Sequence, residues 1–295
     1  MTNIKTRSFP EHNYKAIWHD GKTFRVALDS NKPITEILYP EFYDVGITSK
    51  CMANCRICYV SATNKGHHFD NVVEKVNKFF GTMTENQRPF QVALGGTGEP
   101  TMHPDFSNIL KSFYDLGIVP NYTTNGMHIN NVLIDNTKKY CGGVALSCHP
   151  HLKPYWTNGA ELLIRNGIRT NFHHIISDRE SIDEFMRIYK EYKGRIEYFV
   201  LLLYMPVGRA IEKVIDWNYF EAQIDSIDNI DDIAFSSNFY NFLKGGPGKI
   251  YGVSLYPPEI LSKYLIMDDE MKIYNNSFET KEVDLGWNKW VGLEC

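Results

Sequence analysis

Three of the six cysteines in this 295-residue chain lie within eight positions, in the stretch SKCMANCRICYVSA. Cys51, Cys55 and Cys58 are separated by three and then two residues, so their thiolates can converge on one centre. A structural zinc ion takes four ligands, and the fourth would here be His67, His68 or a distant cysteine. A [4Fe-4S] cluster also normally takes four thiolates, so three cysteines leave one iron open to bind another group. We therefore predict a metal centre at these cysteines, with zinc as the alternative to the cluster.

A second candidate is the glycine-rich stretch ALGGTGEPTMHPDF, in which Gly96, Thr97, Gly98 and Glu99 precede Pro100. Glycine lets the backbone approach a ligand closely, and a carboxylate accepts hydrogen bonds from an ammonium group. The alternative interpretation is a tight turn from a strand into a helix, with Glu99 favoured near the helix start by the helix dipole.

Polar side chains also stand in three further apolar segments, NYTTNG, GGVALSCHP and IRTNFHHIIS. Because side chains alternate along a strand, one face of each segment carries the polar set. The predicted inward-facing residues are Asn125, Ser147, Asn171 and His173. The alternatives are ordinary turn chemistry for Asn and Ser and a structural role for the histidine. Cys148 falls on the opposite face from Ser147, where a free cysteine packs as a small apolar side chain.

The elements that must position these residues alternate regularly between strand and helix. Six apolar, β-rich segments predict strands over residues 43–49, 90–96, 118–125, 142–148, 168–176 and 196–204. Strands that alternate with helices imply parallel pairing with right-handed crossovers. The predicted fold class is α/β, a partial (β/α)6 barrel of the TIM type, with a doubly wound sheet as the alternative. In both folds the chemistry lies at the C-terminal ends of the strands.

Helical periodicity between these strands predicts helices over residues 70–81, 106–117 and 181–194. We expect Asp70 to cap the first helix at its start and Gly81 to end it. Ser181 and Glu184 have the spacing of a capping box at the start of the third.

Composition sets further limits on the class of protein. The formal net charge of -4 and the pI near 6.2 argue against a nucleic acid partner, although a local basic patch is compatible with them. The N-terminal residues lack the apolar segment of a secretion signal, and no apolar run has the ~20 residues of a membrane-spanning helix. Clustered cysteines without a disulfide pattern are typical of a reducing compartment, so we predict a soluble cytoplasmic protein.

The two ends of the chain differ from the regular middle. Asp20-Gly21 between two alternating apolar runs predicts a β-hairpin. The segment LKGGPGKIYG is a break, and beyond it we expect an irregular extension containing a short hairpin. The predicted domains are an N-terminal hairpin extension over 1–40, the partial barrel over 41–232 and a C-terminal extension over 233–295 that caps the barrel.

The CxxxCxxC spacing after the first barrel strand and GGTGEP at the end of the second resemble the motifs of the radical S-adenosylmethionine (radical SAM) superfamily. MPVGRA, after the sixth strand, resembles the last-strand turn of the same family. The resemblance implies one [4Fe-4S] cluster held by Cys51, Cys55 and Cys58, with S-adenosylmethionine bound to the open iron. It also implies reductive cleavage of S-adenosylmethionine to a 5′-deoxyadenosyl radical that removes hydrogen from a substrate. An electron donor such as flavodoxin or ferredoxin is implied as a partner.

The resemblance also assigns roles to residues at the strand ends. The glycine-rich motif would receive the methionyl amino group, and polar residues at the ends of the later strands would contact the nucleoside. His173 would face the substrate and is a candidate catalytic residue. The implied cofactor contacts are Ile57, Gly96, Thr97, Gly98, Glu99, Asn125, Ser147 and Asn171. Ile57 departs from the family pattern, which more often has an aromatic residue there, but the implied contact to adenine is made through the backbone.

Within the superfamily, IRTNFHHIIS resembles a strand of the MoaA-like and SPASM-type branches. Residues 264–278 resemble the hairpin of SPASM domains with Asn or Ser in place of cysteine, which implies a degenerate segment that covers the barrel mouth. Only one cysteine follows Cys148, so no auxiliary cluster is expected. This branch implies a peptide, protein side chain or small metabolite as substrate.

Two other functions stay open on the sequence. The same radical chemistry could modify a nucleoside or an RNA base. In a different class, the chain could be a non-catalytic interaction protein in which the three cysteines hold zinc or an iron–sulfur cluster.

Overall fold

The computed structural model describes residues 4–211, 213–236, 238–239 and 261–278. Its main feature is a nine-stranded sheet in the order β10-β9-β8-β7-β6-β5-β4-β11-β12. All neighbours pair in parallel except β11 and β12, which are antiparallel. The strands are β4 (Phe42–Gly46), β5 (Gln91–Leu94), β6 (Val119–Thr124), β7 (Val144–Ser147), β8 (Thr170–Ile176), β9 (Tyr198–Leu203), β10 (Ile233–Phe235), β11 (Ser262–Ile266) and β12 (Ile273–Tyr274).

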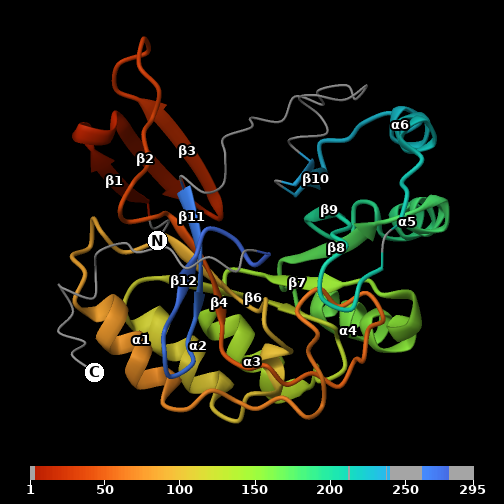
Figure 1. The fold of residues 1–295 in the computed structure, drawn as a ribbon, viewed down its shortest axis with the longest axis horizontal. Coiled ribbons are helices and arrows are strands. Elements are labelled where there is room, and N and C mark those ends of the chain that lie inside the picture. The colour runs from red at the N-terminus through yellow and green to blue at the C-terminus, as the bar shows by residue number, and fades with distance from the viewer. Residues whose placement is uncertain (1–3, 212, 237, 240–260, 279–295) are drawn as a thin grey trace.

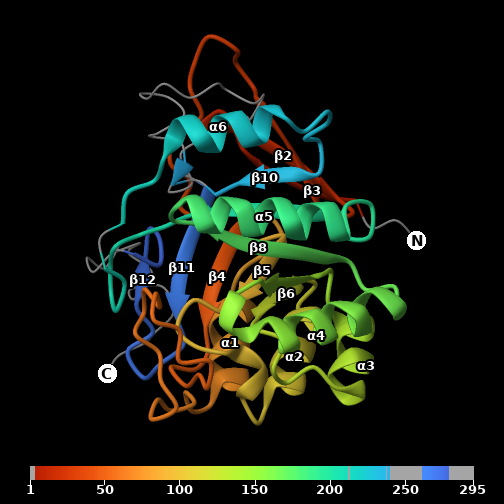
Figure 2. The same ribbon diagram turned by 90° about the vertical axis from the view of Figure 1, so that its right-hand side faces the viewer.

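Helices cover the outer face of this sheet in chain order, from α1 at the lower left of Figure 1 to α6 at the upper right. The view of Figure 2 faces α5 and α6 from outside. The helices are α1 (Val72–Gly81), α2 (Phe106–Asp115), α3 (Asn131–Tyr140), α4 (Lys153–Arg165), α5 (Arg179–Tyr192) and α6 (Trp217–Asp225). Three short 3-10 turns are η1 (Pro10–His12), η2 (Pro100–Met102) and η3 (Pro150–Leu152).

The core between sheet and helices follows from the two periodicities of the sequence. In α1, Val72, Val76 and Phe79 share one helical face and are buried against the sheet. In β6, Tyr122 alternates outward into the same core, while Thr123 faces the inner side of the sheet. Residues on the inner side of six strands, β4 to β9, line one cavity, which shows that the sheet is curved. The predicted α/β class with a partial barrel of parallel strands is confirmed, and all six predicted barrel strands are present.

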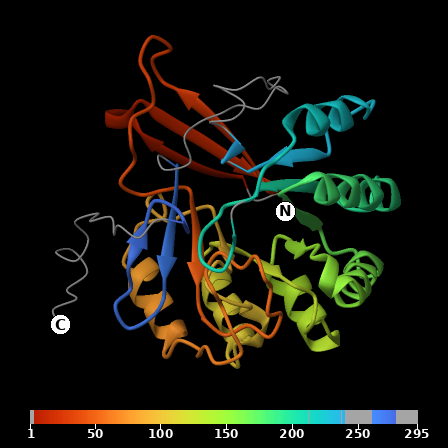
Figure 3. The same cartoon turned by 45° about the vertical axis from the view of Figure 1, so that its right-hand side comes forward.

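The N-terminal part is a three-stranded antiparallel sheet of β1 (Lys5–Phe9), β2 (Tyr14–His19) and β3 (Lys22–Ala27). Figures 1 and 3 show it as a separate red layer on the side away from α1, α2 and α3. The hairpin predicted at Asp20-Gly21 joins β2 to β3, and both residues have the positive φ that this turn needs, 49° and 78°. The sequence analysis did not predict β1, because one of its two buried positions is occupied by a charged residue, Arg7.

Two helix starts differ from the predictions. Asp70 does not cap α1, because the helix begins after Asn71, which adopts a left-handed conformation with no side-chain cap. The predicted capping box of Ser181 and Glu184 is also wrong. Helix α5 begins three residues, about one turn, earlier than that pair requires. Its capping box consists of Asp178 and Ser181, each accepting from the other's backbone N–H.

The C-terminal hairpin predicted within residues 264–278 is present as β11 and β12. The sequence analysis placed this hairpin over the barrel mouth. The structure places β11 in the main sheet, parallel to β4, with Leu265 fully buried in the core. Phe278, beyond β12, does reach the cysteine loop, where its ring lies 4.8 Å from that of Tyr59. The LKGGPGKIYG break and Cys295 lie outside the described residues.

Candidate functional site

The three clustered cysteines lie on the loop between β4 and α1, at the C-terminal edge of the parallel sheet. This loop is closed at its base by backbone contacts. The Cys51 N–H donates to the Thr63 carbonyl at 2.9 Å, and the Ser49 N–H donates to the His67 carbonyl at 3.0 Å. His67 and His68 therefore serve to close the loop, and the His68 Nδ1 lies 3.0 Å from Thr48 Oγ1.

The three thiols lie close enough to influence one another. Burial raises the pKa of Cys51 and raises that of Cys55 to about 12, and the neighbouring thiols act in the same direction on both. Asn125 Nδ2 lies 3.7 Å from Cys51 Sγ, as a donor to that sulfur. Within the described residues, no group of three or more His, Cys, Asp or Glu side chains is arranged to hold a single metal ion.

The donor set nevertheless fits a [4Fe-4S] cluster. Such a cluster takes each thiolate on a different iron, so its ligands need not meet at one point. The three thiols supply the ligands. Their negative charge as thiolates would be compensated by the Asn125 amide, which donates to Cys51, and by the Arg209 guanidinium, which donates to the Cys55 carbonyl. The three loop cysteines would hold the cluster. The described part of the chain offers no fourth thiolate to it, because Cys141 and Cys148 pack in the hydrophobic core.

The glycine-rich turn after β5 lies directly against the cysteine loop. A Cβ atom at Gly98 would stand 2.6 Å from the carbonyl oxygens of Thr48 and Lys50, so only glycine fits there. The Glu99 N–H donates to the Lys50 carbonyl at 2.9 Å. Gly96 has a φ of 82° and faces the Tyr264 ring of β11. The glycines therefore let the turn after β5 pack against protein backbone and side chains from two other elements.

Glu99 is buried, with 3% of its surface exposed, and fixes the end of β6 to the turn after β5. Its Oε1 accepts from Thr101 Oγ1 at 2.6 Å and Thr124 Oγ1 at 2.8 Å, with a longer contact to the Thr101 N–H. Its Oε2 accepts one bond, from the Asn125 N–H at 2.8 Å. Burial raises the pKa of Glu99, and these hydrogen bonds oppose the shift. Because a carboxylate oxygen has two lone pairs, Oε2 can accept one more donor.

Asn125 directly follows β6, and Ser147 is the last residue of the neighbouring strand β7. Asn125 is held by its backbone to Glu99 and by its Oδ1, which accepts from the Met127 N–H at 3.0 Å, so its amide nitrogen is aimed at Cys51. Ser147 pairs with His173 of β8 in the sheet register and is half-buried. Cys148, on the other face, is buried in the outer core, which confirms that it packs there.

Asn171 and His173 lie away from the cysteines, inside the barrel. Together with Asp44, Asn121 and other inward-facing side chains they line a cavity of about 540 Å³ that extends toward the N-terminal ends of the strands. Burial lowers the pKa of His173 to about 4, so the imidazole is neutral near pH 7. None of the three loop cysteines, nor Glu99 or Asn125, is among the residues that line this cavity.

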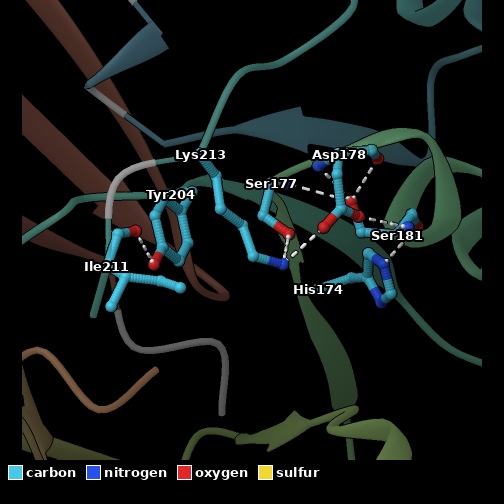
Figure 4. A network of polar contacts seen from close by, with 7 residues as sticks. All are labelled: His174, Ser177, Asp178, Ser181, Tyr204, Ile211 and Lys213. Carbon is cyan, nitrogen blue, oxygen red and sulfur yellow. Dashed lines mark hydrogen bonds and ion pairs between the residues drawn. The ribbon is translucent and has the colours of Figure 1, made fainter. Parts of the chain in front are cut away.

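Ile57 lines a second cavity of about 540 Å³, beside the ends of β7 and β8. His149, Ile175 and Ser177 contribute to its wall, and Lys213 lies at its edge. Figure 4 shows how this region is held together. Lys213 Nζ donates to Ser177 Oγ at 3.3 Å and pairs with the Asp178 carboxylate. The cavity therefore joins the cysteine loop to the start of α5.

The sequence analysis assigned no function to Lys213, Arg209, Tyr59 or Asp44, all of which the structure places around this edge or in the barrel. Arg209 falls in MPVGRA, which was interpreted only as a turn. An arginine directly after a glycine at the end of an apolar strand was the available signal. Lys213 and Asp44 gave no signal, because neither stands in a pattern that differs from an ordinary strand or loop.

No protein-family model matches the chain. Over 114 residues it is 25% identical to the 7,8-dihydro-6-hydroxymethylpterin dimethyltransferase of Methanocaldococcus jannaschii, a match that covers 38% of this chain and 22% of that protein. The fold resembles that of Streptococcus suis SuiB bound to S-adenosylmethionine, with a TM-score of 0.63 and 14% identity over 86% of this chain and 65% of SuiB.

Two further solved structures contain peptides. SuiB bound to the precursor peptide SuiA gives a TM-score of 0.65 with 16% identity, over 85% of this chain and 63% of SuiB. The protein anSMEcpe with bound AdoMet and the Cp18Cys peptide gives 0.59 with 15% identity, over 82% of this chain and 75% of that one. At these identities the likeness establishes the fold. The chain spans about a fifth of the curated relative and less than two thirds of SuiB.

Finally, none of the helices in the described ranges combines the length and apolar character needed to cross a membrane.

Proposed function

We propose that this chain is a radical SAM enzyme that binds one [4Fe-4S] cluster through Cys51, Cys55 and Cys58. When bound, the cluster would supply one electron to the sulfonium of S-adenosylmethionine, whose C5′–S bond would break to give methionine and a 5′-deoxyadenosyl radical able to take a hydrogen atom from the substrate. The observation that carries this proposal is the contact of the cysteine loop with two strand ends. Gly98, after β5, lies against Lys50, and Asn125, after β6, donates to Cys51. The likeness of the fold to structures with bound S-adenosylmethionine supports it.

The residues around the cysteines would orient the cofactor. The free lone pair of Glu99 Oε2 is available to the methionyl ammonium group, and the other three acceptor positions hold the carboxylate in place. The backbone of Gly96, Thr97 and Gly98 lies alongside. Ser147, at the end of β7, and Ile57, on the cysteine loop, would contact the nucleoside, and the cavity beside Ile57 has room for it.

Asn171 and His173 have a different place in the proposal. The family resemblance assigns Asn171 to the nucleoside, but its position deep in the barrel beside His173 favours a contact with the substrate instead. Since burial keeps the His173 imidazole neutral near pH 7, it can accept a hydrogen bond from a substrate or donate one through its N–H.

For the substrate we propose a peptide or a protein side chain. The structures that share the fold over more than 80% of this chain include two with bound peptides. A small molecule is the alternative, because the local sequence relative is named for a pterin substrate. A flavodoxin or ferredoxin would supply the electron.

The test is anaerobic reconstitution with iron and sulfide, followed by dithionite reduction in the presence of S-adenosylmethionine. We expect about four irons per chain and release of 5′-deoxyadenosine. Cys58→Ala should abolish the release, whereas Cys148→Ala, which removes a buried cysteine outside the loop, should retain it. A reconstituted wild type that binds iron and sulfide but never cleaves S-adenosylmethionine would contradict the enzyme proposal. Zinc near one equivalent after anaerobic purification, without iron, would favour a non-catalytic binding protein.

A further inference from the structure

The segment that follows β9 lies against the cysteine loop, although the two are far apart in sequence. We call it the post-β9 segment, residues 204–211 and 213. The Arg209 N–H donates to the Cys58 carbonyl at 3.0 Å, so the backbones of the two segments are in direct contact. The curved sheet separates β9 from β4 by four other strands, so this contact spans the mouth of the barrel.

The Arg209 side chain extends this contact along the cysteine loop. Its Nη2 and Nε both donate to the Cys55 carbonyl, at 3.0 and 3.2 Å, and its Nη1 donates to the Ser61 carbonyl at 3.3 Å. One guanidinium therefore bridges two turns of the loop on either side of Cys58. A planar guanidinium can do this because its N–H groups form a rigid fork.

Gly208 allows the approach. Its φ is 66°, and a Cβ atom there would stand 2.0 Å from the Tyr59 carbonyl oxygen and 2.7 Å from that of Cys58. No side chain fits in this space without displacement of one backbone from the other. The Gly208-Arg209 pair thus combines a close steric fit with four hydrogen bonds to the loop.

Both ends of the post-β9 segment are also fixed to β8 or to the turn after it. At its start, the Tyr204 N–H donates to the Ile176 carbonyl at 3.0 Å. Figure 4 shows that the Tyr204 hydroxyl also donates to the Ile211 carbonyl within the segment. At its end, Lys213 binds Ser177 and the Asp178 carboxylate at the start of α5. A segment fixed at both ends can hold another loop in place between them.

We propose that Arg209 is a positioning residue for the cysteine loop. It fixes the carbonyls of Cys55 and Ser61 so that the loop keeps one conformation before any cofactor binds, and it places a positive charge beside the thiolates. The effect of the charge on a cluster rests on the proposed function. The positioning of the loop does not, because it depends only on hydrogen bonds within the protein. Burial raises the pKa of Cys55 and the Arg209 charge opposes that shift, which is consistent with its proximity.

The first experiment uses the reduced protein without iron. Alkylation of each cysteine is followed by mass spectrometry in wild type, Arg209→Gln and Gly208→Ala. We expect Cys55 to react about five- to tenfold faster in both variants, because release of the loop exposes the thiol to the reagent and to water. Loss of the Arg209 charge alone would act in the opposite direction, since that charge lowers the pKa of Cys55, whereas Gly208→Ala releases the loop and keeps the charge. Arg195→Gln is the matched control, because Arg195 is an exposed arginine whose partner is Glu161 at 2.7 Å, and it should leave the Cys55 rate unchanged.

Cys148 serves as an internal standard in the same samples, because it is buried in the core away from the loop. Faster alkylation of Cys55 with an unchanged Cys148 rate supports local release of the loop. An unchanged Cys55 rate in Arg209→Gln overturns the proposal, and so does a parallel rise at Cys148, which would report general loosening.

The second experiment measures the midpoint potential of the reconstituted cluster in wild type, Arg209→Gln and Arg209→Lys. Loss of a nearby positive charge disfavours the more negative reduced state, so we expect Arg209→Gln to shift the potential to more negative values and Arg209→Lys to stay near wild type. Equal midpoint potentials in all three proteins would show that the Arg209 charge does not act on the cluster. If wild type binds no cluster, the proposed function fails, while the alkylation rates still decide the role of Arg209.

Discussion

Glu99 shows how one side chain can serve both the fold and the site. Its carboxylate is buried and accepts hydrogen bonds from Thr101, Thr124 and Asn125, which link the ends of β5 and β6. The Asn125 amide, held in this way, is then aimed at Cys51. The sequence analysis assigned Glu99 to the cofactor alone. The structure adds that most of its acceptor capacity is used by the protein, so a cofactor contact could involve only Oε2.

We predict that Glu99→Gln lowers the free energy of unfolding by about 2 kcal/mol, because the new amide N–H₂ would face the Asn125 N–H or leave a buried hydroxyl without an acceptor. Chemical denaturation of the protein without iron measures this loss. Glu161→Gln is the control, since its exposed ion pair with Arg195 should contribute about 0.5 kcal/mol. Equal effects of the two substitutions would contradict the structural role of Glu99.

His173 should make stability depend on pH. Burial lowers its pKa to about 4 in the folded state, below the ordinary value of 6.5. Protons therefore bind more readily to the unfolded chain, so stability is full above pH 6.5 and falls as the pH drops toward 4. Between pH 7 and pH 5, the free energy of unfolding should fall by about 1 kcal/mol less in His173→Gln than in wild type. This value is smaller than the full pKa shift would give, because the His173 side chain is only half-buried. If the free energies of unfolding of the two proteins changed equally with pH, the prediction would be wrong, and the charged imidazolium would be well solvated in the cavity.

The side-chain alternation of single strands was predictable from the sequence. Asn171 and His173 were expected to face inward and Cys148 outward, and the structure agrees because one face of each strand packs against helices. The contacts that give these residues partners were not predictable. Asn125 meets Cys51 only because two strands adjacent to β5 bring distant parts of the chain to one edge.

At the scale of elements, the turn after β5 depends on glycine for packing against the cysteine loop. Gly98→Ala would place a Cβ atom 2.6 Å from two backbone carbonyl oxygens, and we expect a loss of about 2 kcal/mol in the free energy of unfolding. Gly81→Ala makes the same chemical change at the end of α1, where the nearest atom would be 3.9 Å away. It should be neutral or stabilising by up to about 1 kcal/mol. Thermal or urea unfolding compares the two, and a harmless Gly98→Ala would mean that the turn and loop are not packed as described.

Helix starts were the least predictable elements. Asp178 and Ser181 form the capping box of α5, whereas Ser181 and Glu184 fit the sequence pattern equally well. The pattern cannot distinguish them, because both pairs precede the same apolar residues. The choice is made by β8, whose last residue is Ile176, so the chain must turn at Ser177 and Asp178. Tertiary constraints from the strand therefore fix the start of the helix.

At the scale of the whole molecule, β11 makes the C-terminal hairpin part of the main sheet. Its pairing with β4 joins residues more than 200 positions apart, for example Leu265 with Val45. The sequence predicted the hairpin from local signals, but it held no signal for this partner. Long-range parallel pairing depends on which edge of the sheet is free, and that is a property of the assembled barrel.

Leu265→Ala should therefore destabilise the whole fold. The side chain is fully buried in the main core, and we expect a loss of about 3 kcal/mol with a single unfolding transition. Leu28→Ala is the control, because Leu28 is 50% exposed and its truncation should change stability by about 0.5 kcal/mol. A small effect of Leu265→Ala, or a separate early transition, would indicate that the hairpin is not integrated with the sheet.

The most direct test of the central proposal is the iron and sulfide content after anaerobic reconstitution, measured in matched cysteine variants. The proposal predicts about four irons and four sulfides per chain in wild type and in Cys148→Ala, with a large loss in Cys51→Ala, Cys55→Ala and Cys58→Ala. Retention of the full iron content by all three loop variants, or a loss in Cys148→Ala equal to theirs, would contradict it.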